Sequence, residues 1–417
     1  MNCRKFFGTH YKVFFLFLHL FFSPLSYAEE ALKIDEAVQI ALDSHPIILA
    51  KKRDIDATSF GLDAAKWQRF PGISAYTSGG QPGKSSVMTS MRIDQPLWTG
   101  GRITSDINSA EARFEGAKVS LVDAEQNIIT RVVSAFIDTV KLEAQIRITN
   151  ENIIEHQRLL ELIQHRADGQ ISPQNEYVMA RSRIATARNE RLVYQNALAN
   201  AKADLEQLLS RKIDRLTIPK PEMNLSKDLS TIIQSVEEFS PQLKKLEFDI
   251  LAAQEDAESK KSQLYPQLSA RHERFNGSNY PDSMTYLALT YQPGNGLSAL
   301  SSSREAEMRK DGLKAEKESN KKEIMDRVRN DFNQYRLSQN QIEVLAELSK
   351  ASLDVYESFV RQYPAGRKTW VEVLNARKEA TQAQMSYTET QWSGYAALLR
   401  IKIAIGDVDS LLINSAK

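Results

Sequence analysis

The chain has 417 residues, and 54 basic and 53 acidic side chains leave a formal net charge of +1. A balance this even argues against a nucleic-acid-binding surface, so we expect no nucleic-acid partner. The only cysteine, Cys3, lies close to the N-terminus, which excludes a disulfide framework or a thiol active site in the rest of the chain.

Residues 1–28 are typical of a secretory signal peptide. A basic start is followed by an apolar run from Val13 to Phe22, and Ser26-Tyr27-Ala28 is a small-x-small cleavage site. Glu29 stands at the cleavage point, where a lipoprotein would need a cysteine, so we expect no lipid anchor. No later stretch reaches about 18 apolar residues, so we expect an exported protein without a membrane-spanning helix.

The first half of the mature chain reads as helices interrupted by one strand pair. Ser44-His45-Pro46 marks a break between two helices, since serine caps a helix and proline suits its first turn. The elements expected in repeat 1, residues 29–230, are helices over 34–70, a strand hairpin over 72–94, a long helix over 102–167 and a return helix over 174–209.

The segment 102–167 dominates this pattern. It contains no proline, and at 1.5 Å per residue it would form a helix roughly 100 Å long. Apolar residues recur every seven positions, for example at Leu121, Ile128 and Ala135. That spacing predicts a coiled coil with a narrow apolar seam.

The second half repeats this order. Four proline or glycine residues at the ends of predicted elements recur at a nearly constant separation. Pro46 and Pro241 are 195 residues apart, as are Pro71 and Pro266, and Pro96 and Pro293 are 197 residues apart, as are Gly169 and Gly366. This indicates a tandem duplication. Repeat 2, residues 231–417, is expected to contain a helix over 241–265, a strand hairpin over 267–291, a long helix over 297–363 and a return helix over 368–405.

The four predicted strands cannot bury a core of their own, and each has one apolar face and nearly the length of a transmembrane β-strand. In lipid such strands must close into a barrel, for which eight is the minimum, so one chain must associate with other copies. Aromatic residues gather where the strands meet the helices, which indicates a belt at the membrane interface: Trp67, Phe70, Trp98, Tyr265 and Tyr291.

The duplicated plan resembles the TolC-like outer-membrane efflux proteins. The resemblance rests on Gln95-Pro96-Leu97-Trp98-Thr99-Gly100-Gly101 and on the stretch from Tyr363 to Ala376, and it covers essentially the whole mature chain. The Gly366-Arg367-Lys368-Thr369-Trp370 form is most similar to the type I secretion branch that exports large adhesins. The resemblance implies a fold that is mainly α with a small β part: a periplasmic α-barrel of long coiled-coil helices and a trimeric, 12-stranded β-barrel in the outer membrane.

The same resemblance implies partners and a gate. The partners are a second and third copy of the chain, a periplasmic adaptor protein, an inner-membrane ABC transporter and outer-membrane lipid. Polar links near the helical turns would close the periplasmic end, with Tyr363 and Lys368 facing Gln174 and Asn175. A ring would narrow the bore at Glu372 and Asn375, where the asparagine replaces a second acidic residue and leaves three rather than six acidic side chains.

No catalytic constellation and no cofactor motif is found in the sequence, so we expect a non-enzyme without a cofactor. His156 and His165 are nine positions apart, half a turn out of phase on a helix, and cannot share a metal. Three functions remain open: a type I secretion channel for a protein substrate, the outer channel of a small-molecule efflux pump, and an exported coiled-coil scaffold without a pore.

Overall fold

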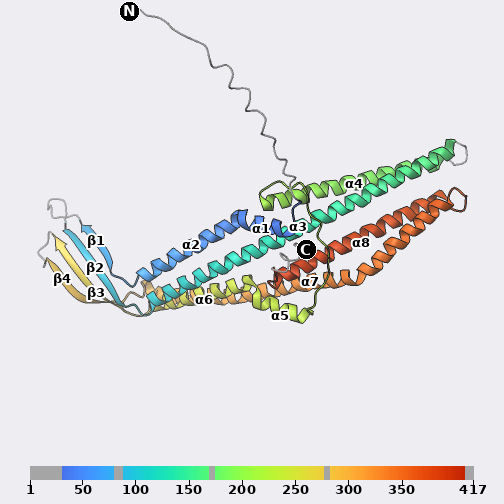
Figure 1. Cartoon of the computed structure of the whole chain (residues 1–417). Helices are drawn as coiled ribbons and strands as arrows, with labels where there is room; N and C mark the ends of the chain where they lie inside the picture. The colour runs from blue at the N-terminus through green and yellow to red at the C-terminus, as the bar shows by residue number, and fades with distance from the viewer. Residues whose placement is uncertain (1–30, 79–87, 169–173, 277–281, 409–417) are drawn as a thin grey trace, which may run out of the picture.

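The computed structural model describes residues 31–78, 88–168, 174–276 and 282–408. A small sheet lies at one end of an elongated helical body, and the turn between the last two helices lies at the other end (Figure 1). The predicted signal peptide lies outside the described residues. The predicted fold class, mainly helical with four strands, is confirmed.

The first half contains α1 (Ile34–Ser44), α2 (Pro46–Trp67), β1 (Gly72–Ser78), β2 (Met88–Trp98), α3 (Arg102–Asp168) and α4 (Gln174–Leu209). The break between α1 and α2 differs in detail from the prediction. Ser44 ends α1, and the ring Nδ1 of His45 accepts the hydrogen bond from the backbone N–H of Ile47 at 3.3 Å. His45 therefore caps α2, because its ring nitrogen reaches the donor that a serine hydroxyl would otherwise satisfy.

The second half contains α5 (Leu229–Phe239), α6 (Pro241–Ser262), β3 (Gln267–Asn276), β4 (Ser283–Thr290), a 3-10 turn η1 (Asn295–Leu297), α7 (Ser298–Gln362) and α8 (Trp370–Ala404). Ser240 caps α6 by accepting from the N–H of Leu243 at 3.4 Å. α6 ends three residues before the expected 265, and β2 runs four residues beyond the expected 94. The pairing of β2 with β3 shifts register between Pro96 and Trp98, because proline offers no N–H to the ladder.

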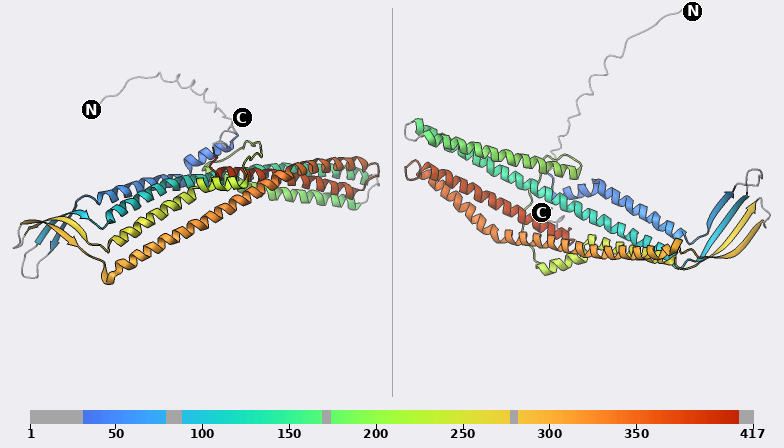
Figure 2. Two further views of the ribbon diagram at one scale, coloured as in Figure 1. Left: turned by 90° about the horizontal axis from the view of Figure 1, so that it is seen from below. Right: turned by 180° about the vertical axis from the view of Figure 1, so that it is seen from behind.

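The helices form a curved row. α2 and α4 lie in series along α3, and α6 and α8 lie in series along α7 (Figures 1 and 2). α3 also packs against α6 and α8. The row therefore has four positions in order: α2 with α4, α3, α6 with α8, and α7. One edge of the row is therefore formed by α2 and α4, and the other by α7.

The sheet follows the same order. Its strands pair antiparallel as β1-β2-β3-β4, which leaves β1 at the edge on the α2 side and β4 at the edge on the α7 side. Gly100 and Gly101, with φ of +62° and +93°, turn the chain from β2 into α3. A Cβ at Gly100 would lie 3.0 Å from Cβ of Tyr265, so only glycine allows this close approach.

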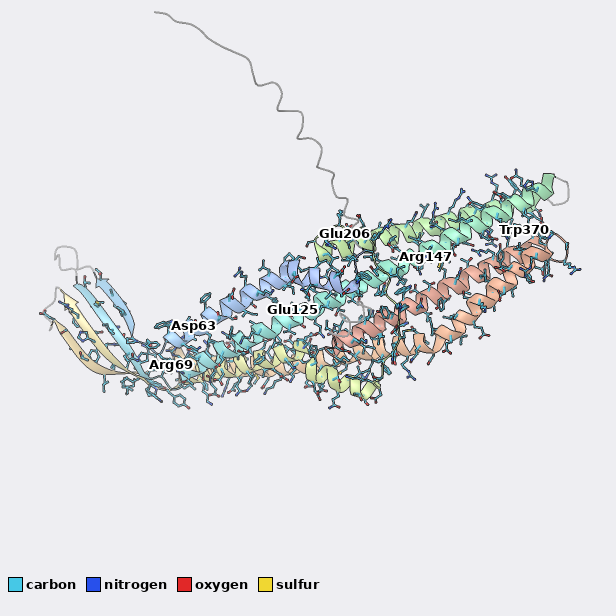
Figure 3. The ribbon with its side chains drawn as sticks, viewed as in Figure 1. Asp63, Arg69, Glu125, Arg147, Glu206 and Trp370 are labelled. Carbon is cyan, nitrogen blue, oxygen red and sulfur yellow. The ribbon has the colours of Figure 1, made fainter. Side chains whose placement is uncertain are left out.

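Buried side chains are concentrated at the waist and at the tip of the row. At the waist, α1 and the middle of α3 enclose a large apolar cluster that includes Phe136 and Leu205. At the tip, Trp370 is fully buried among Leu159, Ile163 and Leu374 (Figure 3). Of the helices in the described part of the chain, none is long and apolar enough to cross a membrane.

Candidate functional site

The turn between α7 and α8 builds the tip to which the predicted gate residues belong. Tyr363 is buried, and its ring lies 5.4 Å from that of Trp370. Its hydroxyl donates to Oε2 of Glu176 in the first turn of α4 at 3.1 Å. The tip of the second half is thereby joined to the start of α4, one residue from the predicted partner Asn175.

Lys368 and Glu372 lie close together at the start of α8. Nζ of Lys368 donates to Oε1 of Glu372 at 2.8 Å and lies 4.1 Å from the centre of the Phe359 ring. Thr369 and Glu372 form a capping box: the backbone N–H of Thr369 donates to Oε2 of Glu372 at 2.8 Å, and the N–H of Glu372 donates to Oγ1 of Thr369 at 3.3 Å.

These contacts stabilise the ionised carboxylate. The Lys368 ammonium, followed by the donors of Thr369, lowers the pKa of Glu372 to about 2. Glu372 therefore stays charged at any physiological pH, and within the same chain it is paired with a cation. Both of its carboxylate oxygens already accept hydrogen bonds.

The other predicted gate residues are placed as follows. Asn375, one turn after Glu372, is exposed and lines a shallow groove of about 430 Å³ with Leu348, Lys378, Glu379 and Gln382. Asn175 is exposed in the first turn of α4. Gln174 begins α4, and its side chain lies outside the described part of the structure.

A buried polar cluster, which the sequence analysis missed, lies above this tip. Nε of Arg377 on α8 donates to Oδ1 of Asn152 on α3 at 2.9 Å, and Oγ1 of Thr381 donates to the same oxygen at 3.0 Å. Arg377 lies over the ring of Tyr356 at 5.3 Å, and the Tyr356 hydroxyl donates to Glu155. The one signal in the sequence is His156, a polar residue at a position of the seven-residue apolar series that includes Leu121 and Ile128.

His156 adjoins the cluster. It is 6% exposed, and its Nδ1 has no hydrogen-bond partner among the described residues. Burial, together with the nearby positive charges of Arg377 and Arg183, lowers its pKa to about 4. The imidazole is therefore neutral at neutral pH.

The sheet separates its side chains onto two faces. On one face, Arg92 forms an ion pair with Glu273, and Asp94 forms one with Arg271 at 2.6 Å. In each pair the two residues lie directly opposite each other in the β2–β3 register. The other face carries Arg274 and His272 of β3 and large apolar side chains that are exposed in the single chain: Ile73, Met91, Leu287 and Leu289. For β2, with Met91 on one face and Arg92 on the other, this matches the one apolar face expected for each strand.

The predicted aromatic residues lie at the junction of sheet and helices. They come from the end of α2, the end of β2 and the segments flanking β3 and β4, and the rings of Trp67 and Phe70 are 5.1 Å apart. All five are exposed: Trp67, Phe70, Trp98, Tyr265 and Tyr291.

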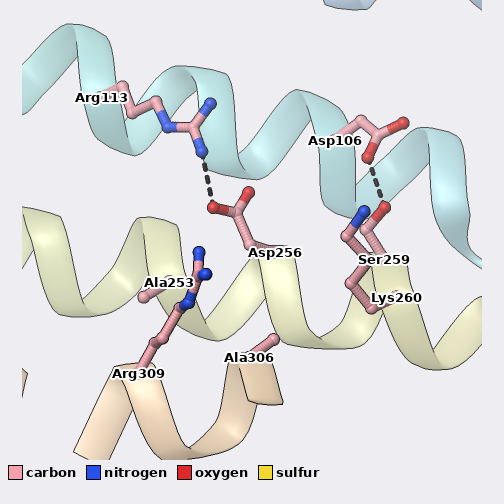
Figure 4. A pocket seen from close by; sticks show the side chains of 8 residues that line it. All are labelled: Asp106, Arg113, Ala253, Asp256, Ser259, Lys260, Ala306 and Arg309. Atoms are coloured by element: carbon pink, nitrogen blue, oxygen red, sulfur yellow. Dashed lines mark hydrogen bonds and ion pairs between the residues drawn. The ribbon is translucent and has the colours of Figure 1, made fainter. Parts of the chain in front are cut away.

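A pocket of about 330 Å³ lies between α3, α6 and α7 near the sheet (Figure 4). Asp256 accepts from Arg113 at 2.5 Å and from Ser109 at 2.6 Å, and Asp106 accepts from Ser259 at 2.5 Å. Both carboxylates accept hydrogen bonds from residues of the neighbouring helix, so the pocket is explained by polar packing between helices. In the described ranges no group of three or more His, Cys, Asp or Glu side chains is arranged to hold a metal ion.

Comparison with known proteins agrees with this architecture. The structure is similar to the outer-membrane channel OprN, with a TM-score of 0.80, 17% identity and 89% of each chain covered. It is also similar to the outer membrane protein VceC from Vibrio cholerae, with a TM-score of 0.77 and 14% identity over 89% of this chain and 96% of that one.

At the level of sequence, the outer membrane efflux protein BepC of Brucella suis biovar 1 (strain 1330) is 24% identical over 184 residues. That match spans 40% of this chain and 40% of BepC. The model of the family described as outer membrane efflux protein matches two segments, residues 37–211 and 232–407. Together these segments cover most of the chain, and the chain therefore belongs to the outer membrane efflux protein family.

Proposed function

We propose that three copies of this chain close into one channel that spans the outer membrane and continues into the periplasm. The observation that carries the proposal is that the sheet and the helical row have their edges on the same two sides: β1 with α2 and α4 on one side, and β4 with α7 on the other. Among the described residues, β1 and β4 each have one edge that pairs with no other strand. An unpaired strand edge in lipid is unfavourable, so these strands require partners from other copies.

The helical edges carry matching apolar surface. Exposed apolar side chains follow α4 on one edge and α7 on the other: Val178, Leu192 and Val193 on α4, and Leu337, Val344 and Val355 on α7. Head-to-tail contact between these edges buries both and, when the rotation closes, gives a ring. With four strands per chain, three copies supply 12 strands, above the minimum of eight for a membrane barrel.

The two faces of the sheet fit this assembly. The apolar face, with Ile73 and Leu287, would contact lipid, and the charged face, with Arg92 and Glu273, would line the lumen. The exposed aromatic residues at the junction would then form the interfacial belt on the periplasmic side. The helical body would extend from there into the periplasm.

The tip residues fit a periplasmic gate. We assign Tyr363, with its bond to Glu176, and Lys368 to the contacts that hold neighbouring helix pairs together, with Gln174 and Asn175 on the facing segment. Glu372 and Asn375 would narrow the bore. Tyr363→Phe removes the hydroxyl contact and keeps the ring stacked on Trp370, so it should raise the conductance of the reconstituted channel; an unchanged conductance would contradict this role.

The substrate we propose is a large exported protein, delivered by an inner-membrane ABC transporter through a periplasmic adaptor. The support is the Gly366-Arg367-Lys368-Thr369-Trp370 motif and its resemblance to the type I secretion branch. A small-molecule efflux role is the second candidate, favoured by the relative BepC, whose name describes an efflux protein. A pore-free scaffold protein is disfavoured by membership of the efflux family.

One deletion strain separates these functions. A secretion channel predicts that a large protein disappears from the medium and accumulates inside the cells, while sensitivity to toxic small molecules is unchanged. An efflux channel predicts raised sensitivity and unchanged secretion. Fractionation of the wild-type strain tests the channel itself: a detergent-requiring trimer in the outer membrane supports it, and a soluble monomer contradicts it.

A further inference from the structure

The buried polar cluster above the tip joins the two halves of the molecule. Its members come from three helices: Asn152, Glu155 and His156 from α3, Tyr356 from α7, and Arg377 and Thr381 from α8. Arg377 is 5% exposed and Asn152 is 6% exposed, so their contact is as inaccessible to solvent as the apolar core around it. α3 packs directly against α8 here, and the contact therefore connects the α3–α4 pair to the α7–α8 pair.

The guanidinium of Arg377 is buried without a compensating charge in direct contact. Its acceptor is the neutral amide of Asn152, and among the described residues no carboxylate lies within ion-pair distance of it. Glu155 is linked to the cluster through the Tyr356 hydroxyl, and the negative charges of Glu155 and Glu151 act on Arg377 from beyond ion-pair distance. Burial accordingly lowers the pKa of Arg377, and the neutral state of His156 avoids a second positive charge beside it.

The free energy of this interface therefore depends on whether α3 and α8 are in contact or apart. A buried cation held by neutral groups regains its hydration when the helices part, whereas an apolar contact only loses packing. The contact lies seven residues into α8 from Trp370, which corresponds to about 10 Å from the start of that helix. Movement of the tip of α8 away from α3 would therefore hydrate Arg377.

We propose that the Asn152–Arg377 contact is a positioning pair for the gate: it balances the closed and open positions of the α7–α8 tip, independently of the Tyr363–Glu176 contact. This inference rests on the proposed channel function. Asn152 supplies the acceptor that keeps Arg377 buried, and the desolvated charge of Arg377 keeps the interface from becoming permanently closed. Neither residue needs to touch the substrate.

The proposal predicts opposite effects for two substitutions at one contact. Asn152→Ala leaves Arg377 buried without its acceptor and favours separation, so the open fraction of the channel should rise about tenfold or more. Arg377→Met replaces the cation by an apolar side chain of similar length, while Asn152 still accepts from Thr381. The open fraction should then fall by a similar factor.

The experiment uses full-length trimers in planar bilayers, with single-channel recording of the open fraction and gel assay of trimer stability. Arg147→Met on α3 is the matched control, because Arg147 is exposed on the same helix (Figure 3). If Asn152→Ala does not assemble, Asn152→Leu also removes the acceptor and nearly keeps the side-chain volume. It should change the open fraction in the same direction.

Each outcome has one meaning. Opposite shifts in Asn152→Ala and Arg377→Met, with trimers intact and the control unchanged, support the positioning pair. Shifts in the same direction indicate a simple structural brace and overturn it, as do two unchanged variants. Wild-type trimers that conduct no current would instead contradict the proposed channel function.

Discussion

Nζ of Lys368 lies 2.8 Å from Oε1 of Glu372, one helical turn away at the start of α8. A lysine that the family resemblance assigns to a link between helix pairs is thus paired, in the single chain, with the acid assigned to the constriction. The pair is partly exposed, so it is worth little in stability. Its importance is electrostatic, because it fixes the charge that the tip presents.

We expect the ion selectivity of the proposed channel to depend on both members of this pair. Glu372→Gln removes a carboxylate from each copy and should lower cation selectivity, whereas Lys368→Met removes the compensating cation and should raise it. The reversal potential in a salt gradient measures both. Two variants with wild-type reversal potentials would show that α8 presents this face away from the bore.

The pH dependence of this selectivity follows from the lowered pKa of Glu372, about 2. A carboxylate with a depressed pKa keeps its charge at every pH above that value. Cation selectivity should therefore stay constant from pH 7 to pH 4 and decline only near pH 2. A midpoint close to the ordinary glutamate value would mean that Lys368 and Thr369 do not hold the carboxylate in the assembled channel.

His156 should make the folding stability of the protein decrease at acidic pH. Its pKa is about 4 in the folded chain, below its ordinary value of 6.5, so the unfolded chain binds more protons between these values. The contribution of His156 to stability should fall as pH decreases from 6.5 to 4, by on the order of 3 kcal/mol per chain, and should not change further below pH 4.

The measurement is the thermal unfolding of the purified wild-type protein and of the His156→Asn variant, in which asparagine supplies an amide of similar polarity that does not titrate. The loss of melting temperature between pH 6.5 and pH 4 should be smaller in the variant. Identical pH profiles would contradict the assignment of this step to His156.

Gly394 allows α7 and α8 to approach closely. A Cβ at this position would lie 2.5 Å from Cβ of Ser338 and 2.8 Å from the sulfur of Met223. Ser338 is fully buried on α7 and cannot move aside, so Gly394→Ala should destabilise the fold by about 1–3 kcal/mol. Gly312→Ala on α7, where nothing lies within 4 Å, is the control, and denaturant unfolding compares them. Equal stability of the two variants would contradict the close approach.

The cross-strand pair of Arg92 and Glu273 should stabilise the sheet. Glu273 is buried, so Glu273→Gln leaves Arg92 opposite a neutral side chain and should lower the temperature at which the proposed trimer dissociates on gels. The exchange Arg92→Glu with Glu273→Arg restores the pair in reverse and should recover part of this loss. An exchange variant less stable than Glu273→Gln would show that the pair does not act as an isolated unit.

The sequence by itself determined the order of elements and the two-faced strands. Periodicity is a local property: the seven-residue spacing within 102–167 and the alternation around Met91 and Arg92 depend only on the geometry of one helix or one strand. The local exceptions are equally physical. His45 replaces Ser44 as the cap because a ring nitrogen can reach the same donor, and β2 continues through Pro96 because a bulge accommodates the missing N–H.

Only the tertiary structure decided which polar side chains meet. Glu176 as the partner of Tyr363, and Asn152 as the acceptor of Arg377, come from helices far apart in sequence, and their contact depends on the rotation and offset of α3, α4, α7 and α8 in the row. A seam pattern specifies that a helix has a buried side, but many helix arrangements satisfy one apolar seam. The packing of whole helices therefore selects the polar contacts of the tip.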